Sequence, residues 1–384
     1  MNTYIIDGVY TPRASVKKGQ SKYSQVHPQE LLTACIKELQ ARQGALVNAA
    51  QSAYFGCVSQ VGDQGANIAR NAILSAGLDH SVSAVSLNMC CGSGLESVLL
   101  AASVVSAPVS AAMGGLALAG GVESMSRVKM ASDGGGMDGN NEILRRTILQ
   151  EPQGIAADRI AEHENISREE LDRFALSSHN KASKALSEDY FQANYAFVKD
   201  DGGNILLAKE DHARADTSLE ALANLKSSFI NFHTAGNSSG IADGAATVLV
   251  ANEATVKANG LKPRARILAV ASSGSDPVEM LTGPAACALS ILTKLGMSAQ
   301  DIDLWEINEA FAVVPLYTIR RLGIDPEKVN IKGGAIALGH PLGATGSILL
   351  MTLINALEKE NKQTGCAVLC VAGGQSVAIL IERV

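Results

Sequence analysis

The chain has 384 residues, of which 47% are hydrophobic, and a formal net charge of -6 at pH 7. This length and apolar content predict a compact soluble protein of two or three domains, and the negative charge argues against nucleic acid as a partner. The few aromatic residues and 36 glycines suit closely packed strand and helix layers with sharp turns, so we expect an α/β fold.

The cysteine pattern and the ends of the chain predict a cytoplasmic protein. The odd number of cysteines and the lack of C-x-x-C pairs argue against a secreted disulfide framework, and no metal site is visible. The first residues lack a signal or transit pattern, and the last three are not a peroxisomal signal. The uncharged stretch 97–122 is long enough to span a bilayer but is rich in Ala, Ser and Gly, so we expect a buried helix and a buried strand and no membrane partner. The cysteines are Cys35, Cys57, Cys90, Cys91, Cys287, Cys366 and Cys370.

In the first part of the chain, short apolar strands alternate with helices, which is the pattern of βαβ units. The expected elements are strands at 4–6, 53–58 and 85–88 and helices at 28–43 and 68–77. The middle, from about 124 to 234, carries most of the charge and a long polar helix, for which Ser167 is the expected N-cap and Glu170 its capping-box partner. We expect this middle part to be an inserted, more exposed subdomain.

After Gly240 the alternation returns. The expected elements are strands at 246–251, 265–272, 304–307, 329–331, 367–371 and 377–381 and a helix that begins at Pro284. Each half contains a strand, a glycine-rich turn with a reactive type of residue, and a helix, so a duplication is expected.

The segment 87–98, LNMCCGSGLESV, places Cys90 and Cys91 directly before a glycine-rich turn that opens a helix. A thiol at a helix N-terminus lies near the positive end of the dipole and near free N–H groups, which favour the thiolate and can bind an oxyanion. By this placement Cys91 is the better nucleophile. The alternative is that both cysteines are small buried apolar residues, and the motif alone leaves both interpretations open.

A glycine-rich turn, a strand end and an apolar run carry further candidate polar side chains. In GGAIALGHPLGATG, Pro341 suits the first position of a helix, which leaves His340 at its entrance, where it can accept a proton from a thiol or face a carbonyl oxygen. Cys370 ends an apolar strand before a glycine pair, and Asn308 with Glu309 interrupts the apolar run LWEINEAFA. Each of these residues can also be structural.

Two nucleotide-binding interpretations have little support. The sequence GSGLES at 92–97 is close to the dinucleotide fingerprint, but it ends in Ser and no acidic residue follows about twenty positions on. This weakens the interpretation of the chain as a nicotinamide oxidoreductase. Residues 334–341 imitate a P-loop, but His340 and Pro341 replace the Lys and the hydroxyl residue that phosphate and magnesium require.

Four blocks taken together, in order and spacing, resemble the active-site blocks of the thiolase family. They are NMCCGSG with Cys91, NEAFA at 308–312, GHP at 339–341 and CVAGG at 370–374. The resemblance extends through AGGVESMS, ISREELDRFALSSHNKA, DTSLEALANLK and TAGNSSGIADGAA, so it covers nearly the whole chain.

The resemblance implies two similar βαβαβαββ halves in a layered α/β/α/β/α core. Residues 1–117 with 240–262 would form the first half, 263–384 the second half and 118–239 an inserted loop domain. It further implies a homodimer or homotetramer that transfers acyl groups between coenzyme A thioesters through an acyl-cysteine. The implied reactions are condensation of two acetyl-CoA to acetoacetyl-CoA and thiolysis of 3-ketoacyl-CoA, with coenzyme A as substrate and product and no permanently bound cofactor.

The same resemblance implies roles for individual residues. His340 would activate Cys91, and Cys370 would move the α-proton of the second thioester. One oxyanion hole would use His340 and a water held by Asn308, and the other the N–H groups of Cys91 and Ala372. The implied coenzyme A contacts are Arg214, Leu225, Phe229, Ala235 and Ser239, and the implied lining of the substrate pocket includes Gln153 and Phe311.

Three departures from the family pattern leave the substrate and the assembly open. Ala372 replaces a glycine in the last block, and its Cβ requires a compatible φ. Pro152 and Gln153 put a polar amide where an apolar side chain is usual, and the segment 127–150 is short. An acyl-CoA-binding protein with little turnover is therefore an alternative, although binding alone needs no nucleophile.

Overall fold

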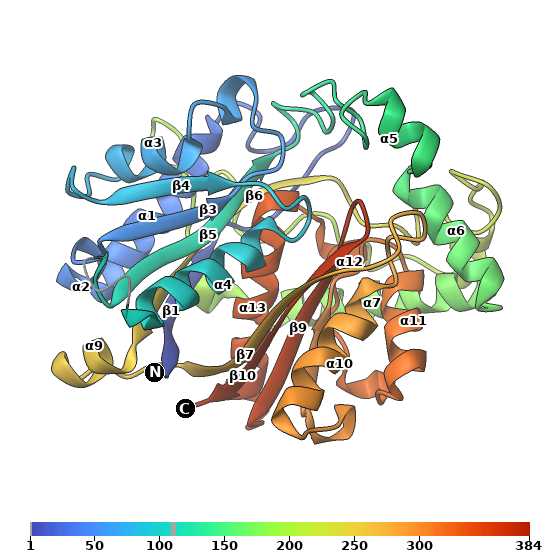
Figure 1. Cartoon of the computed structure of the whole chain (residues 1–384). Helices are drawn as coiled ribbons and strands as arrows, with labels where there is room; N and C mark the ends of the chain where they lie inside the picture. The colour runs from blue at the N-terminus through green and yellow to red at the C-terminus, as the bar shows by residue number, and fades with distance from the viewer. Residues whose placement is uncertain (1, 109–112) are drawn as a thin grey trace.

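The computed structural model describes residues 2–108 and 113–384, which form one ten-stranded sheet with helices on its faces (Figure 1). The strands are β1 (Thr3–Tyr10), β2 (Ala14–Ser15), β3 (Ser52–Gly56), β4 (Ser83–Leu87), β5 (Leu116–Ser124), β6 (Ala242–Asn252), β7 (Ala265–Gly274), β8 (Leu304–Ile307), β9 (Thr364–Val371) and β10 (Gln375–Arg383). The α-helices are α1 (Pro28–Gln43), α2 (Ala45–Asn48), α3 (Ile68–Ser75), α4 (Ser93–Ser106), α5 (Glu142–Thr147), α6 (Gln153–His163), α7 (Arg168–Ser187), α8 (Leu219–Ala223), α9 (Glu253–Ala258), α10 (Gly283–Leu295), α11 (Val313–Leu322), α12 (Ala335–Leu338) and α13 (Leu342–Lys359). Short 3-10 helices are η1 (Gly62–Gln64), η3 (Gln192–Asn194), η4 (Ala299–Asp301) and η5 (Pro326–Lys328).

The sheet is a duplicated four-strand pattern. In the first half, β1 pairs antiparallel with β6, β6 antiparallel with β5, and β5 parallel with β3. The second half repeats this order with β7, β10, β9 and β8. The halves meet where β1 pairs antiparallel with β7 from Thr3 to Ile5, which makes the sheet continuous. The α/β fold and the duplication that the sequence predicts are therefore confirmed.

The helices form three layers around the two halves of the sheet. α4 and α13 pack against each other and against strands of both halves, whereas α1 lies on the outer side of the first half and α10 on that of the second. Three apolar clusters fill the spaces between these layers. The residues of α13 from Leu342 to Leu357 are all buried, as expected for a helix that is covered on every side. This is the α/β/α/β/α order that the resemblance implies.

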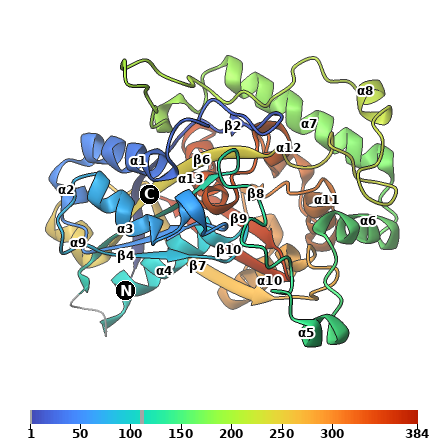
Figure 2. The same ribbon diagram turned by 90° about the horizontal axis from the view of Figure 1, so that it is seen from above.

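In the view of Figure 2, the helices between β5 and β6 lie around the second half, with α7 along the top, α6 at the right and α5 at the bottom right. Of these helices, α6 and α7 pack against α11 of the second half, and α7 also contacts α12. Helix α7 begins with the predicted capping box: the Ser167 side chain accepts from the Glu170 N–H, and the Glu170 carboxylate accepts from the Ser167 N–H.

Three boundaries differ from the sequence prediction. Residues 329–331 form only an isolated bridge between Trp305 and Val329, because Asn330 takes a positive φ of 46° and uses its side chain to bind the backbone of Ile307. Pro341 is the N-cap of α13 and not its first residue. Strand β5 runs from Leu116 to Ser124, across the predicted boundary at 117/118.

The uncharged stretch 97–122 contains α4 and β5, as predicted, and its residues 109–112 lie outside the described part of the chain. Across the residues that are described, we find no helix with both the length and the apolar character needed to cross a bilayer.

Candidate active site

Glycines bring the starts of α4 and α13 and the end of β9 into contact. A Cβ at Gly94 would lie 2.7 Å from the carbonyl oxygen of Gly343, and one at Gly92 would lie 2.7 Å from Cγ2 of Val371. Ser347 of α13 donates a 2.6 Å hydrogen bond to the carbonyl of Gly94. The three segments that carry Cys91, His340 and Cys370 therefore converge, and any larger residue at these glycines would separate them.

Cys91 is a buried thiol directly before α4. Its side chain is 4% exposed and packs with Met125 and Leu342, and the preceding Cys90 has a positive φ of 43°. Burial, followed by the nearby Cys370 and Cys90 thiols, raises the pKa of Cys91 well above its ordinary value. Burial thus opposes the thiolate that the helix terminus is expected to favour.

His340 is held in one tautomer by its neighbours. The Thr345 hydroxyl donates to the Pro341 carbonyl at 2.9 Å, so at 2.6 Å it accepts from Nδ1–H of His340. Nε2 then carries the lone pair and accepts from Nδ2 of Asn308 at 3.3 Å. Burial, together with the positive charge of Arg13, lowers the pKa of His340 to about 4. The imidazole is therefore a neutral base at neutral pH.

Asn308 is fixed by the backbone around it. Its N–H donates to the carbonyl of Val368 in β9, two residues before Cys370. Its side-chain Oδ1 is buried and has no hydrogen-bond partner among the described residues. An unpaired buried acceptor beside His340 fits a bound water or a substrate group.

The segment TAGNSSG (234–240) holds two of the predicted blocks together. Ser239 N–H donates to the carbonyl of Ala310, and Ala312 N–H donates to that of Asn237. His340 N–H donates to the carbonyl of Gly240 at 2.8 Å. The NEAFA and GHP blocks are therefore both hydrogen-bonded to this one segment.

Cys370 and Ala372 lie at the turn between β9 and β10. Burial raises the pKa of Cys370 to about 12. Gly373 and Gly374 have φ values of 81° and 78°, whereas Ala372 is not among the residues with positive φ. The alanine that departs from the family pattern therefore occupies the one position of this triplet where a Cβ causes no backbone strain.

The predicted substrate-pocket residues lie beside predicted coenzyme A contacts. The rings of Phe229 and Phe311 meet edge to face with centroids 5.9 Å apart. Phe229 also covers Gly154, where a Cβ would lie 2.1 Å from the ring. Gln153, the residue before Gly154, is half-buried. Leu225 packs on Gly236 of TAGNSSG. Leu225 and Phe229 are nevertheless 36% and 41% exposed, which leaves an apolar surface at this end.

The remaining predicted contacts are less closely gathered. Arg214 and Ala235 are exposed, and Ser239 is half-buried. The backbone N–H of Arg214 donates to Nδ1 of His179 at 3.2 Å.

Two buried acids hold the site in place: Glu309, which the sequence marks as polar within an apolar run, and Glu123, which the sequence prediction missed. Glu123 of β5 accepts from the N–H groups of Val58, Ser59 and Gly343, and so connects the first half to the start of α13. Glu309 accepts from Ser178, Asn330 and Ile336 N–H. Burial raises the pKa of both carboxyl groups. In the sequence, both glutamates stand inside otherwise apolar runs, and this is the pattern that could have indicated a buried acid.

Asp158 of α6 is a third buried acid that holds backbone N–H groups in place, here in the segment that follows Phe229. It accepts from the N–H groups of residues 230–233 and from Nδ1 of His233. Burial opposes ionisation of this carboxyl, but the hydrogen bonds outweigh burial and lower its pKa below the ordinary value. The loop that presents Phe229 is thus anchored on one carboxylate.

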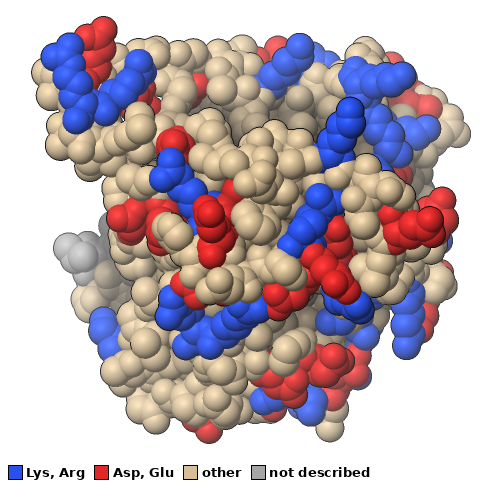
Figure 3. All heavy atoms as spheres, turned by 90° about the vertical axis from the view of Figure 1, so that its right-hand side faces the viewer, with Lys and Arg blue, Asp and Glu red and all other residues tan. Residues whose placement is uncertain are grey.

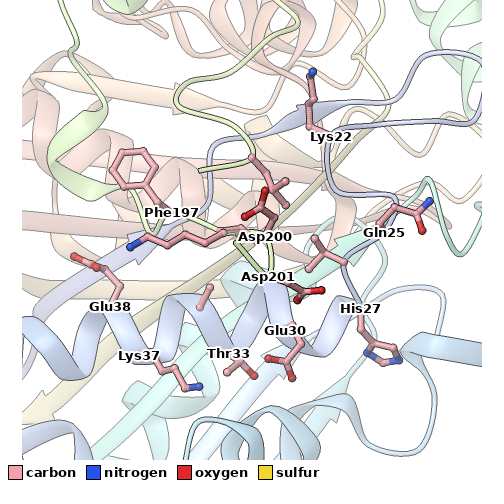
Figure 4. Close-up of a pocket in the computed structure, with 15 residues that line it drawn as sticks. Lys22, Gln25, His27, Glu30, Thr33, Lys37, Glu38, Phe197, Asp200 and Asp201 are labelled. Atoms are coloured by element: carbon pink, nitrogen blue, oxygen red, sulfur yellow. The ribbon is translucent and has the colours of Figure 1, made fainter. Parts of the chain in front are cut away.

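A separate groove of about 860 Å³ lies between α1 and residues 197–206, and none of the predicted site residues line it (Figure 4). Its lining mixes both charge signs, with Lys37, Glu30 and Asp200 among the side chains. On the face shown in Figure 3, basic and acidic side chains are likewise interspersed. Within the described ranges, no group of three or more His, Cys, Asp or Glu side chains could hold a metal ion.

These features describe an α/β protein in which two buried cysteines, Cys91 and Cys370, and a buried histidine, His340, lie on three adjoining segments. The family models "Thiolase, N-terminal domain" and "Thiolase, C-terminal domain" match residues 3–254 and 261–383. A 3-ketoacyl-CoA thiolase of Aliivibrio fischeri is 37% identical over 393 residues, which cover 100% of this chain and 99% of the relative. A beta-ketoadipyl-CoA thiolase of Pseudomonas aeruginosa is also 37% identical, over 99% of both chains.

Among solved structures, the crystal structure of the Bacillus anthracis acetyl-CoA acetyltransferase superposes with a TM-score of 0.88 at 34% identity, and covers 100% of this chain and 99% of that one. The chain belongs to the thiolase family and is a thiolase-type acyltransferase. The family resemblance seen in the sequence is confirmed.

Proposed function

We propose that the protein transfers acyl groups between coenzyme A thioesters through an acyl-Cys91 intermediate, in thiolysis of 3-ketoacyl-CoA and in condensation of two acetyl-CoA. The observation that carries this proposal is the convergence of Cys91, His340 and Cys370, all buried and all neutral at rest. The names of the similar proteins, a 3-ketoacyl-CoA thiolase and an acetyl-CoA acetyltransferase, support it.

In the first half-reaction, Sγ of Cys91 attacks the thioester carbonyl while its proton passes to Nε2 of His340. The carbon–sulfur bond to coenzyme A then breaks, and the leaving thiolate takes the proton of Cys370. This leaves an acyl-Cys91, an imidazolium and a Cys370 thiolate. Because His340 and Cys91 are both neutral at rest, proton transfer accompanies attack and no standing thiolate is required.

In the second half-reaction, the Cys370 thiolate removes the α-proton of acetyl-CoA, and the resulting carbanion attacks the acyl-Cys91 carbonyl. The Cys91 sulfur leaves and recovers its proton from His340. A thiol whose pKa is raised to about 12 is a strong base once ionised, which suits the removal of a proton from carbon. Thiolysis is the reverse of these steps.

We propose two oxyanion sites, each formed by groups already described. One oxyanion would be stabilised by two donors: the protonated Nε2 of His340, and a water that also donates to the unpaired Oδ1 of Asn308. The backbone N–H groups of Cys91 and Ala372 would stabilise the other. The negative φ of Ala372 is consistent with an N–H that is placed as a glycine would place it.

Coenzyme A is proposed to lie along the loop domain, with the pantetheine against Leu225 and Phe229 and the phosphates near Arg214. Ala235 and Ser239 would border the same channel. They belong to TAGNSSG, in which Gly236 packs against Leu225 and Gly240 accepts a hydrogen bond from the His340 N–H. Exposed apolar side chains beside a buried reactive centre support this path.

We also propose a homodimer or homotetramer in the cytoplasm. β4 is an edge strand whose Val85 is 48% exposed, and an open edge favours pairing with a second copy. All seven cysteines are free thiols, which suits a reducing compartment.

The test is the conversion of acetoacetyl-CoA and coenzyme A to acetyl-CoA, followed by chromatography, for the wild type and for Cys91→Ala and His340→Ala. We expect turnover by the wild type and losses of about 10³-fold or more in both variants. The matched control is Cys90→Ala, which removes the adjacent thiol and should keep most of the rate. Retention of the rate by Cys91→Ala, or an equal loss in Cys90→Ala, would contradict the assignment.

A further inference from the structure

Two glutamines before and at the start of α6 border the proposed active site. Gln150 lies against the turn that follows Cys370, because a Cβ at Gly373 would be 3.6 Å from Nε2 of Gln150. Gln153 precedes Gly154, which is covered by the ring of Phe229. The short segment 150–153 therefore extends from the second thiol to the aromatic pair formed by Phe229 and Phe311.

Each glutamine has one buried polar atom with nothing to bind. Oε1 of Gln150 and Nε2 of Gln153 are inaccessible to solvent and have no hydrogen-bond partner among the described residues. Leaving such an atom unpaired costs about 1–3 kcal/mol, so buried amides are normally paired. A plain alkyl chain placed here would leave both atoms unpaired.

The N-terminus of α6 lies at the same place. The N-cap of this 11-residue helix is Pro152, which makes no side-chain cap hydrogen bond. The first N–H groups of a helix need acceptors from elsewhere, and the positive end of the dipole favours an anion. Gln153 is the first residue of the helix, so its side-chain amide belongs to the same helix end as these N–H groups.

We propose, as an extension of the proposed function, that the preferred acyl chain carries a hydroxyl at its far end, which accepts from Nε2 of Gln153 and donates to Oε1 of Gln150. The thioester end would lie at Cys91, and the far end would satisfy the two orphan amide atoms. Gln153 is then a specificity-determining residue, and its polarity is the reason that it replaces the usual apolar side chain.

The experiment compares thiolysis of matched 3-ketoacyl-CoA substrates of six and eight carbons, each as the plain chain, the ω-hydroxy chain and the ω-carboxy chain. We expect kcat/KM to be at least tenfold higher for the ω-hydroxy chain than for the plain chain of equal length. The ω-carboxy chain has no donor for Oε1 of Gln150, so a preference for it over the ω-hydroxy chain would overturn the proposal. Equal or better use of the plain chains at both lengths would overturn the proposal.

Gln153→Met supplies the matched variant, because Met has a similar length and no hydrogen-bonding amide. It should reduce or reverse the preference for the ω-hydroxy chain. Gln300→Met, at an exposed position of the 3-10 helix η4, is the control and should keep both the wild-type preference and the wild-type rate with acetoacetyl-CoA. An unchanged preference in Gln153→Met would overturn the role of this residue. Failure of every substrate, acetoacetyl-CoA included, would instead overturn the proposed function.

Discussion

The anchoring of the Phe229 loop on Asp158 gives the most quantitative prediction. In Asp158→Asn, one side-chain oxygen can still accept from the N–H groups of Ile230, Asn231 and Phe232. The other becomes an NH₂ group that faces the His233 N–H, which in the wild type donates to Oδ1 of Asp158 at 2.7 Å. One buried N–H loses its partner, at about 1–3 kcal/mol, and the remaining bonds lose their charge assistance. We expect a loss of about 2–4 kcal/mol in the free energy of unfolding.

Urea unfolding measures this loss, and substrate kinetics measure its consequence. Because the loop carries Phe229 and not the reactive groups, KM for coenzyme A should rise more than kcat falls. The matched control is Asp201→Asn, on an exposed turn, which should change neither quantity. A variant with wild-type stability and wild-type KM would refute the anchoring role. The folded-state pKa of Asp158 is lowered, so its contribution is complete above the ordinary carboxyl pKa of about 4 and is lost as pH falls below it. The difference between wild type and variant should therefore shrink in acid.

Further predictions concern the reactive groups. Cys370→Ala should still form acyl-Cys91 from acetyl-CoA yet lose condensation by about 10³-fold, and normal condensation would remove its role as the base. Asn308→Ala should lower kcat about 10²-fold with little change in KM, and an effect on KM alone would assign it to binding. Thr345→Val should lower kcat about tenfold or more, because Nδ1–H of His340 loses its acceptor; proton NMR of the imidazole would show whether the tautomer changes. His340 has a lowered pKa in the folded state, so protonation of the unfolded chain should reduce stability as pH falls from about 6.5 to 4, and His340→Gln should flatten this slope in a pH series of unfolding curves.

Local sequence signals predicted the elements whose boundaries they control. Pro28 at the start of α1 and the apolar run Leu304–Ile307 gave the observed bounds, because proline and apolar periodicity act over a few residues. The expected strand at 329–331 failed because the side chain of Asn330 competes for the backbone of Ile307 across 23 positions, which no local pattern contains.

The candidate site divides in the same way. Motif spacing and the family resemblance were enough to name Cys91, His340, Cys370 and Asn308, but not to place them in space. The protonation state of Cys91 depends on burial by Met125 and Leu342, which the dipole argument from sequence left out. Asp158, Glu123 and the orphan amide of Gln150 act through contacts between distant segments, so only the folded chain reveals them.

The most direct measurement is the intact-protein mass after incubation with acetyl-CoA, and separately with acetoacetyl-CoA, for the wild type and Cys91→Ala. The account predicts one acetyl adduct on the wild type, located at Cys91 by peptide mapping, and none on the variant. An adduct that persists in Cys91→Ala, or wild-type turnover of acetoacetyl-CoA without any acyl-enzyme, would contradict covalent acyl transfer through this cysteine.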